Sequence, residues 1–202
     1  LIMCLGALGA MLLAMVIAIA VLYHDGDKKD QKVEPRYGLF QAVPSDAVAL
    51  ACLSHMKDVS QPAFSGFLFL SSLSDAVSQG HFATLAEAPM AFSLHYSGKL
   101  SPLYIFDVGA ASPNPSSEAS ELMAFGQRNG LQTAYVDCSS VLDGQGLATR
   151  SLVVMAETET LVKSSRRHLS QSLSVMGNPG FSQAAAAASG TDLLFVSYAQ
   201  AK

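Results

Sequence analysis

A cysteine and a histidine three positions apart are the first residues whose types suit metal chemistry. Cys52 and His55 could each supply one ligand. Residues 47–55 alternate in polarity, which is typical of a β-strand, and successive strand side chains point to opposite faces. Because Cys52 and His55 then point in opposite directions, we expect no metal site.

Two carboxylates, Asp107 and Asp137, each stand late in a predicted strand. If those strands were neighbours, the pair could act as a general acid and a general base. The alternative interpretation is that both carboxylates face solvent at strand ends, and it is the one we favour. We therefore expect no catalytic residues from this pair.

A dense basic cluster, Arg166-Arg167-His168, lies inside the long helix predicted at 159–176. Helical spacing places these residues mostly outward, so the cluster is either an ordinary solvated helix face or a contact for an anionic partner. Such a partner would be anionic lipid or an acidic protein. Arg166 and Arg167 are the candidate contact residues.

Two cysteines, Cys52 and Cys138, are expected to face the core from their strands. In an oxidising compartment they could form a disulfide, which in the chain-entropy model would stabilise the fold by at most about 4–5 kcal/mol. The alternative is a pair of buried thiols that pack as small apolar groups, which we favour because nothing makes the two strands adjacent.

Several sequence patterns of enzymes and nucleic-acid binders are missing. The chain has no phosphate-binding loop, dinucleotide fingerprint, nucleophile elbow or paired-histidine zinc motif. A net charge of −4 argues against a nucleic-acid partner held by bulk charge. We expect a protein that is not an enzyme, binds no cofactor and binds no nucleic acid.

The first 23 residues are expected to form a membrane helix. The 12 basic and 16 acidic residues of the chain all follow Tyr23. As a helix, residues 1–23 would extend about 34 Å, enough to cross a hydrocarbon core of about 30 Å. Ala18-Ile19-Ala20 has the form of a signal-peptidase site, so a cleaved signal peptide is the alternative, but the apolar run is longer than a usual signal core.

A stripe of small residues runs along this predicted helix. Gly6, Ala10, Ala14 and Ala18 recur every four positions, which would let a second membrane helix approach closely. We expect both membrane lipid and a membrane-protein partner around this helix.

The remaining chain divides into a linker and one folded domain. Residues 24–36 are polar, without apolar periodicity, and form a juxtamembrane linker; residues 37–202 form the domain, in a native chain that could be longer. Helices are predicted at 62–79, 118–128, 159–176 and 184–188, and strands at 47–55, 90–96, 103–108, 131–138, 147–156 and 193–198. The order predicts an α+β fold, a mostly antiparallel sheet with helices packed on one face.

Four short segments resemble a family of uncharacterised envelope proteins of Bacteroidota that share a domain of unknown function. They are Val43-Pro44-Ser45-Asp46-Ala47, Arg167-His168-Leu169, Asn178-Pro179-Gly180-Phe181 and Asp192-Leu193-Leu194-Phe195-Val196. The resemblance implies an N-terminal anchor, an extracytoplasmic α+β domain and a longer native chain. It supplies no catalytic residues.

The sequence thus favours a single-pass protein of the inner membrane with its C-terminal domain in the periplasm. The basic residues after the predicted helix (Lys28, Lys29, Lys32 and Arg36) would by themselves place that flank inside, so charge leaves the topology open. The leading hypothesis is a protein-interaction module, a subunit or accessory of an envelope complex such as a secretion or insertion machine. The alternatives are a periplasmic ligand-binding or sensor domain and a hydrolase whose active site lies beyond residue 202.

Overall fold

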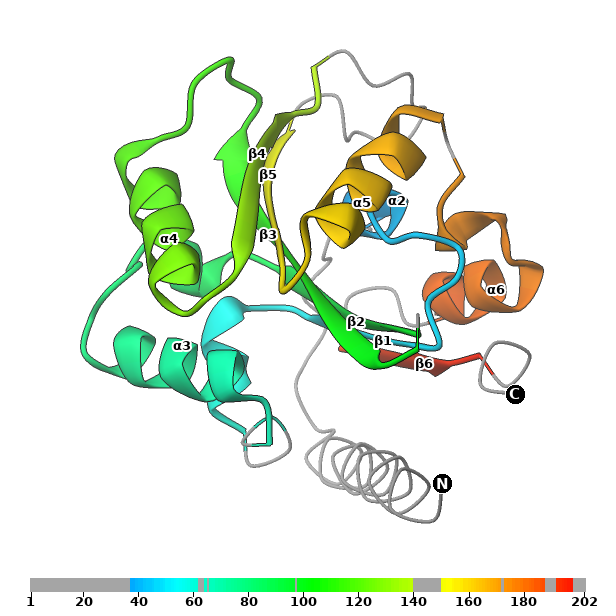
Figure 1. Ribbon diagram of the computed structural model, residues 1–202, viewed down its shortest axis with the longest axis horizontal. Coiled ribbons are helices and arrows are strands. Elements are labelled where there is room, and N and C mark those ends of the chain that lie inside the picture. The colour runs from blue at the N-terminus through cyan, green and yellow to red at the C-terminus, as the bar shows by residue number, and fades with distance from the viewer. Residues whose placement is uncertain are drawn as a thin grey trace.

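Six antiparallel strands form one sheet at the centre of the protein (Figure 1). The computed structural model describes residues 37–61, 64, 66–96, 98–139, 150–171, 173–187 and 192–197. The strands are β1 (Ala49–Leu53), β2 (Met90–Tyr96), β3 (Leu100–Ala110), β4 (Gln132–Asp137), β5 (Arg150–Ala156) and β6 (Leu193–Val196), in the spatial order β4-β5-β3-β2-β1-β6. The predicted α+β class and the antiparallel sheet are confirmed.

Helices cover both faces of the sheet, so the prediction that they pack on one face is wrong (Figure 1). On the first face lie α3 (Leu68–Ser78) and α4 (Ser117–Arg128), and on the second lie α2 (Tyr37–Gln41), α5 (Glu159–Gln171) and α6 (Pro179–Ala187). The physical reason is that the central strands are apolar on both sides. In β3, Tyr104 and Phe106 join the core of the first face, whereas Leu103 and Ile105 join that of the second.

Strands β2 and β3 form a tight hairpin and are the two central strands of the sheet. Their register runs from Met90 opposite Phe106 to Tyr96 opposite Leu100. Gly98, in the connection, has a φ of +84°, a conformation that glycine adopts without a steric penalty. The sequence predicted this hairpin, and it is confirmed.

Two helices start at residues that the sequence pattern did not indicate. The helix predicted at 62–79 is α3 and begins at Leu68, because Phe64 and Phe67 pack into the same core from outside the helix and so prolong the apolar spacing. The helix predicted at 184–188 is α6 and begins at Pro179, because Asn178 Oδ1 accepts hydrogen bonds from the N–H groups of Gly180 (3.0 Å) and Phe181 (3.3 Å). An asparagine cap followed by proline is a common helix start.

Three short 3₁₀ turns complete the described elements: η1 (Met56–Ser60), η3 (Leu85–Glu87) and η5 (Val175–Gly177). The last of these explains why the helix predicted at 159–176 is shorter in the structure. Helix α5 ends at Gln171, and Ser174 Oγ then caps η5 by accepting from Met176 N at 3.3 Å.

In the part of the chain that the structure describes, none of the helices has both the length and the apolar character needed to cross a bilayer. The predicted membrane helix (1–23), its stripe of Gly6, Ala10, Ala14 and Ala18, and the predicted linker (24–36) lie outside the described residues. They remain predictions.

Candidate functional site

A buried histidine joins strand β2 to the loop before β1. Ser93 and His95 lie on the second face of β2, and both are buried, with exposed fractions of 0% and 3%. His95 Nδ1 lies 2.9 Å from Asp46 Oδ1, and Ser93 Oγ lies 2.9 Å from His95 Nε2. With a proton on Nδ1, the ring donates to the carboxylate and accepts from the hydroxyl.

The hydrogen bond from His95 lowers the pKa of Asp46 below its usual value and outweighs the opposing effect of partial burial. Serine, histidine and aspartate side chains joined in this order resemble a nucleophilic triad. In a triad the serine is accessible and the aspartate is buried, whereas here the serine is buried and the aspartate is exposed. The Asp46 side chain is 62% exposed, whereas the hydroxyl that would attack a substrate is in the core. A nucleophile must reach its substrate, so this geometry fits a structural tie between loop and strand.

The same loop is also tied to α5 and η5. Ser165 Oγ, on the buried side of α5, donates to Ala42 O at 2.5 Å, and Val175 N donates to Val43 O at 2.9 Å. Residues 42–46 therefore connect the strand that carries His95 with the helix that carries the basic cluster.

His168 differs from the outward position that the sequence predicted. Its side chain is half-buried, and Nδ1 is a buried atom that has no hydrogen-bond partner among the described residues. The basic cluster is thus split: His168 turns toward the domain, whereas Arg166 and Arg167 are exposed.

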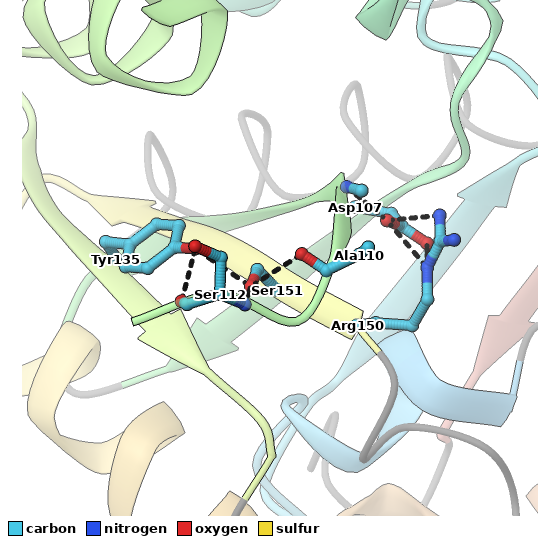
Figure 2. Close-up of polar contacts among 7 residues, drawn as sticks. Asp107, Ala110, Ser112, Tyr135, Arg150 and Ser151 are labelled. Carbon is cyan, nitrogen blue, oxygen red and sulfur yellow. Dashed lines mark hydrogen bonds and ion pairs between the residues drawn. The ribbon is translucent and has the colours of Figure 1, made fainter. Parts of the chain in front are cut away.

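A bidentate ion pair between Asp107 and Arg150 joins the end of β3 to the start of β5 (Figure 2). Arg150 Nε lies 2.9 Å from Asp107 Oδ2, and Arg150 Nη2 lies 2.7 Å from Asp107 Oδ1. Gly109 N also donates to Asp107 Oδ1, at 3.0 Å, where the register between β3 and β5 shifts. The carboxylate is 11% exposed and the arginine 42%, so the pair holds the irregular end of β3 to the start of β5.

Beside this pair, the Tyr135 hydroxyl contacts three oxygen atoms, and Figure 2 shows its contacts with Ser112 and Ser151. It donates to Ser112 O at 2.8 Å or Asn114 O at 3.2 Å and lies 2.9 Å from Ser151 Oγ. Ser151 Oγ in turn accepts from Ser112 N at 3.1 Å. These bonds fasten the loop that follows β3 onto β4 and β5, so the cluster is a structural network.

The carboxylate pair considered from the sequence is not formed. Asp107 stands opposite Leu152 and Asp137 stands opposite Ser151, its neighbour on β5, so the two aspartates belong to opposite faces of the sheet. Asp107 pairs with Arg150, while Asp137 Oδ1 accepts from Ser139 N at 3.0 Å. Arg150 was missed because a sequence pattern does not reveal which strand lies beside β3.

The disulfide considered from the sequence is not formed. Cys52 lies in β1 and Cys138 directly follows β4, and three strands (β2, β3 and β5) stand between them. At about 4.8 Å per strand the separation is about 19 Å, whereas bonded cysteines have Cα atoms within about 7 Å. Both residues are buried, and they are not bonded to each other.

The metal pair of Cys52 and His55 is likewise not assembled. Cys52 is buried on the second face, while His55 Nδ1 lies 3.3 Å from Asp58 Oδ2 near the surface. Among the described residues no group of three or more His, Cys, Asp or Glu side chains is placed to hold a metal ion.

Two exposed arginines stand out among the described basic residues. Arg166 and Arg167 make no ion pair within the described part of the chain. The other described lysines and arginines each contact an acidic or aromatic side chain; they are Lys57, Lys99, Arg128, Arg150 and Lys163. The candidate anionic contact is therefore available on the solvent side of α5.

Strand β6 forms an apolar edge of the sheet (Figure 1). Its residues, Leu193 to Val196, are all only half-buried, and no described strand pairs with its outer side. Ser197 N donates to Val48 O at 2.9 Å, and because backbone groups alternate in direction along a strand, Leu194 and Val196 direct their N–H and C=O groups away from β1.

The opposite edge of the sheet is different in character. Strand β4 carries Gln132, Thr133 and Asp137 among its six residues. Polar and charged side chains are the usual protection of an edge strand against pairing with another chain, and β6 has none. The sequence predicted a strand at 193–198, which corresponds to β6, but contained no signal that this strand would be outermost.

Comparison of the chain with protein-family models, curated proteins and solved structures found no match.

Proposed function

We propose that the protein is a membrane-anchored, extracytoplasmic interaction module, which works by contact rather than catalysis within a larger envelope complex. The observation that carries this proposal is the apolar edge of β6, on whose outer side no described strand lies. An extended segment of a partner protein would add to the sheet there, with its backbone bonding to the outward groups of Leu194 and Val196.

The described polar side chains support contact rather than catalysis. Ser93, His95 and Asp46 tie a loop to β2, and Asp107 and Arg150 hold two strands together. Placement in the inner membrane with the domain in the periplasm, and kinship with the Bacteroidota envelope family, belong to the same proposal and rest on the sequence.

The proposal is tested by removing one outward N–H from the edge. In Leu194→Pro the ring removes an N–H that points away from β1, so the ladder to β1 keeps its bonds. We expect this variant to lose the partner that copurifies with the native chain in mild detergent, by roughly tenfold, since one to two backbone hydrogen bonds of about 1 kcal/mol are lost.

The matched control is Leu194→Ala, which shortens the same side chain but keeps the N–H. It should retain the partner, and both variants should melt cooperatively. Val196→Pro removes the second outward N–H and should repeat the loss. Folded proline variants that retain the partner would contradict strand addition at β6.

A further inference from the structure

The described chain begins on the same face of the sheet as the two exposed arginines. Leu39 and Phe40 of α2 share one core cluster with Val162 and Leu169 of α5, and Figure 1 shows both helices on that side. Ala42, which follows α2, accepts the hydrogen bond from Ser165, the neighbour of Arg166. The described domain therefore begins at α2, on the same face of the sheet as α5.

The geometry of α5 directs its positive charge away from the sheet. Ser165 faces the core, and Arg167, two positions on, lies on nearly the opposite side of the helix because each residue turns about 100°. Arg166 is also exposed. Lys163, on the same outer side, is already paired with Glu159 at 2.9 Å, so among the described residues of α5 the two arginines carry the uncompensated charge.

The predicted linker limits how far the domain can lie from the membrane. Residues 24–36 can extend at most about 45 Å at about 3.5 Å per residue. Neither arginine has an acidic partner among the described residues, and the surface of a membrane rich in anionic lipid attracts such groups.

We propose that Arg166 and Arg167 bind anionic phospholipid headgroups of the membrane in which the chain is anchored. This inference rests on the anchor in the proposed function and adds to it the orientation of the domain: the second face lies toward the lipid, and the edge of β6 stays open to a partner. Since the net charge of the chain is −4, bulk attraction does not hold the domain there, and the contact depends on these two side chains.

The contact is measured with a single fluorophore on the outer side of α5. The sequence contains no tryptophan, so Ser170→Trp, at an exposed position, gives the full chain one reporter. The chain is reconstituted into vesicles of phosphatidylcholine, with or without phosphatidylglycerol, that carry a trace of dansyl-labelled lipid. Energy transfer from the introduced indole to dansyl should rise when phosphatidylglycerol is present and fall in high salt.

Charge variants in the same background identify the residues responsible. R166E/R167E should remove the rise, because each arginine strengthens attachment to an anionic surface roughly fivefold and the pair roughly 25-fold. R166K/R167K should keep it. K57E/K99E, which changes the net charge equally at two exposed ion pairs elsewhere, should also keep it.

The failures of the two proposals are distinguishable. A chain that does not float with vesicles in high salt contradicts the anchor. A chain that floats but shows the same transfer in both lipids, or after charge reversal, contradicts the lipid contact alone. If reversal leaves the transfer unchanged but abolishes copurification of an acidic protein, the arginines bind that protein and the lipid proposal is wrong.

Discussion

At the scale of single residues, the Asp107–Arg150 pair is the most buried of the ion pairs that the described lysines and arginines form. Two hydrogen bonds of 2.7 and 2.9 Å join the groups, and the carboxylate is almost buried. Removing the arginine leaves a carboxylate without its counter-charge, with the Gly109 N–H as a remaining donor.

We therefore expect Arg150→Met to lower the free energy of unfolding by about 1–3 kcal/mol, measured by urea denaturation in mild detergent. Adding Asp107→Asn to the Arg150→Met variant should lower the free energy of unfolding little further, because the carboxylate charge that lost its partner is then removed. If the two changes are additive, the ion pair does not stabilise the end of β3 in the way described.

Acid should weaken the hydrogen bond between Asp46 and His95. Because the folded state lowers the pKa of Asp46, the carboxylate contributes stability at pH values above its usual pKa of 3.8, and this contribution disappears as the pH falls through the lowered value. The side chain is largely exposed, so the contribution is at most about 1 kcal/mol.

The measurement compares the wild type with Asp46→Asn, whose amide oxygen still accepts from Nδ1. We expect the wild type to be more stable near neutral pH and the difference in unfolding free energy to vanish in strong acid. A difference that stays constant with pH would show that the charge of Asp46 has no part in the tie.

The hydrogen bonds that join the buried Ser93 and His95 to Asp46 could not be predicted from the sequence. Ser93 and His95 occupy alternate positions of β2, which on a sheet with one covered face would be solvent-exposed. They are buried because α2, α5 and α6 cover the second face. Covering of that face is decided by contacts between distant segments, which a local pattern does not contain.

At the scale of elements, α4 packs unusually closely on the sheet at Gly126. A Cβ added there would lie 2.5 Å from Met155 Sδ and 3.1 Å from Thr133 Cγ2. Such distances require the helix or the methionine to shift, so the glycine sets the spacing between α4 and strands β4 and β5.

Gly126→Ala should therefore lower the free energy of unfolding by about 1–3 kcal/mol, although alanine is the better helix former. Gly177→Ala is the matched control, since a Cβ there meets nothing within 4 Å, and it should change stability by less than about 0.5 kcal/mol. Equal effects at both positions would contradict close packing of α4.

Most strands and helices were predictable from the sequence because each has its own local signal. Ser116 caps α4, its Oγ accepting from Ala119 N at 3.1 Å, and the alternation of residues 90–96 and 103–108 marked the central hairpin. The starts of α3 and α6 were not predicted, since Phe64 and Phe67 continue the apolar spacing and an Asn-Pro pair both ends and begins helices.

The candidate surfaces were only partly predictable. The exposure of Arg166 and Arg167 followed from helical periodicity, but their lack of an acidic neighbour among the described residues required the fold. The role of β6 as an edge depends on its pairing with β1, across more than 140 residues of chain, which strand propensity does not specify.

At the scale of the whole molecule, the two edges of the sheet have different properties. The β4 edge carries polar residues and contacts α4 and α5, whereas the β6 edge is apolar, half-buried and contacts α6. One end of the sheet is thus protected against association and the other is suited to it, which is the arrangement expected of a module that binds a partner strand in one place.

The most direct test of this account is the composition of the particle isolated from membranes in mild detergent, determined by native mass spectrometry. The account predicts that the chain leaves the membrane together with a partner protein in fixed stoichiometry. It also predicts that this partner is lost in Leu194→Pro and kept in Leu194→Ala. A monodisperse monomer of the native chain, without any partner, would contradict it.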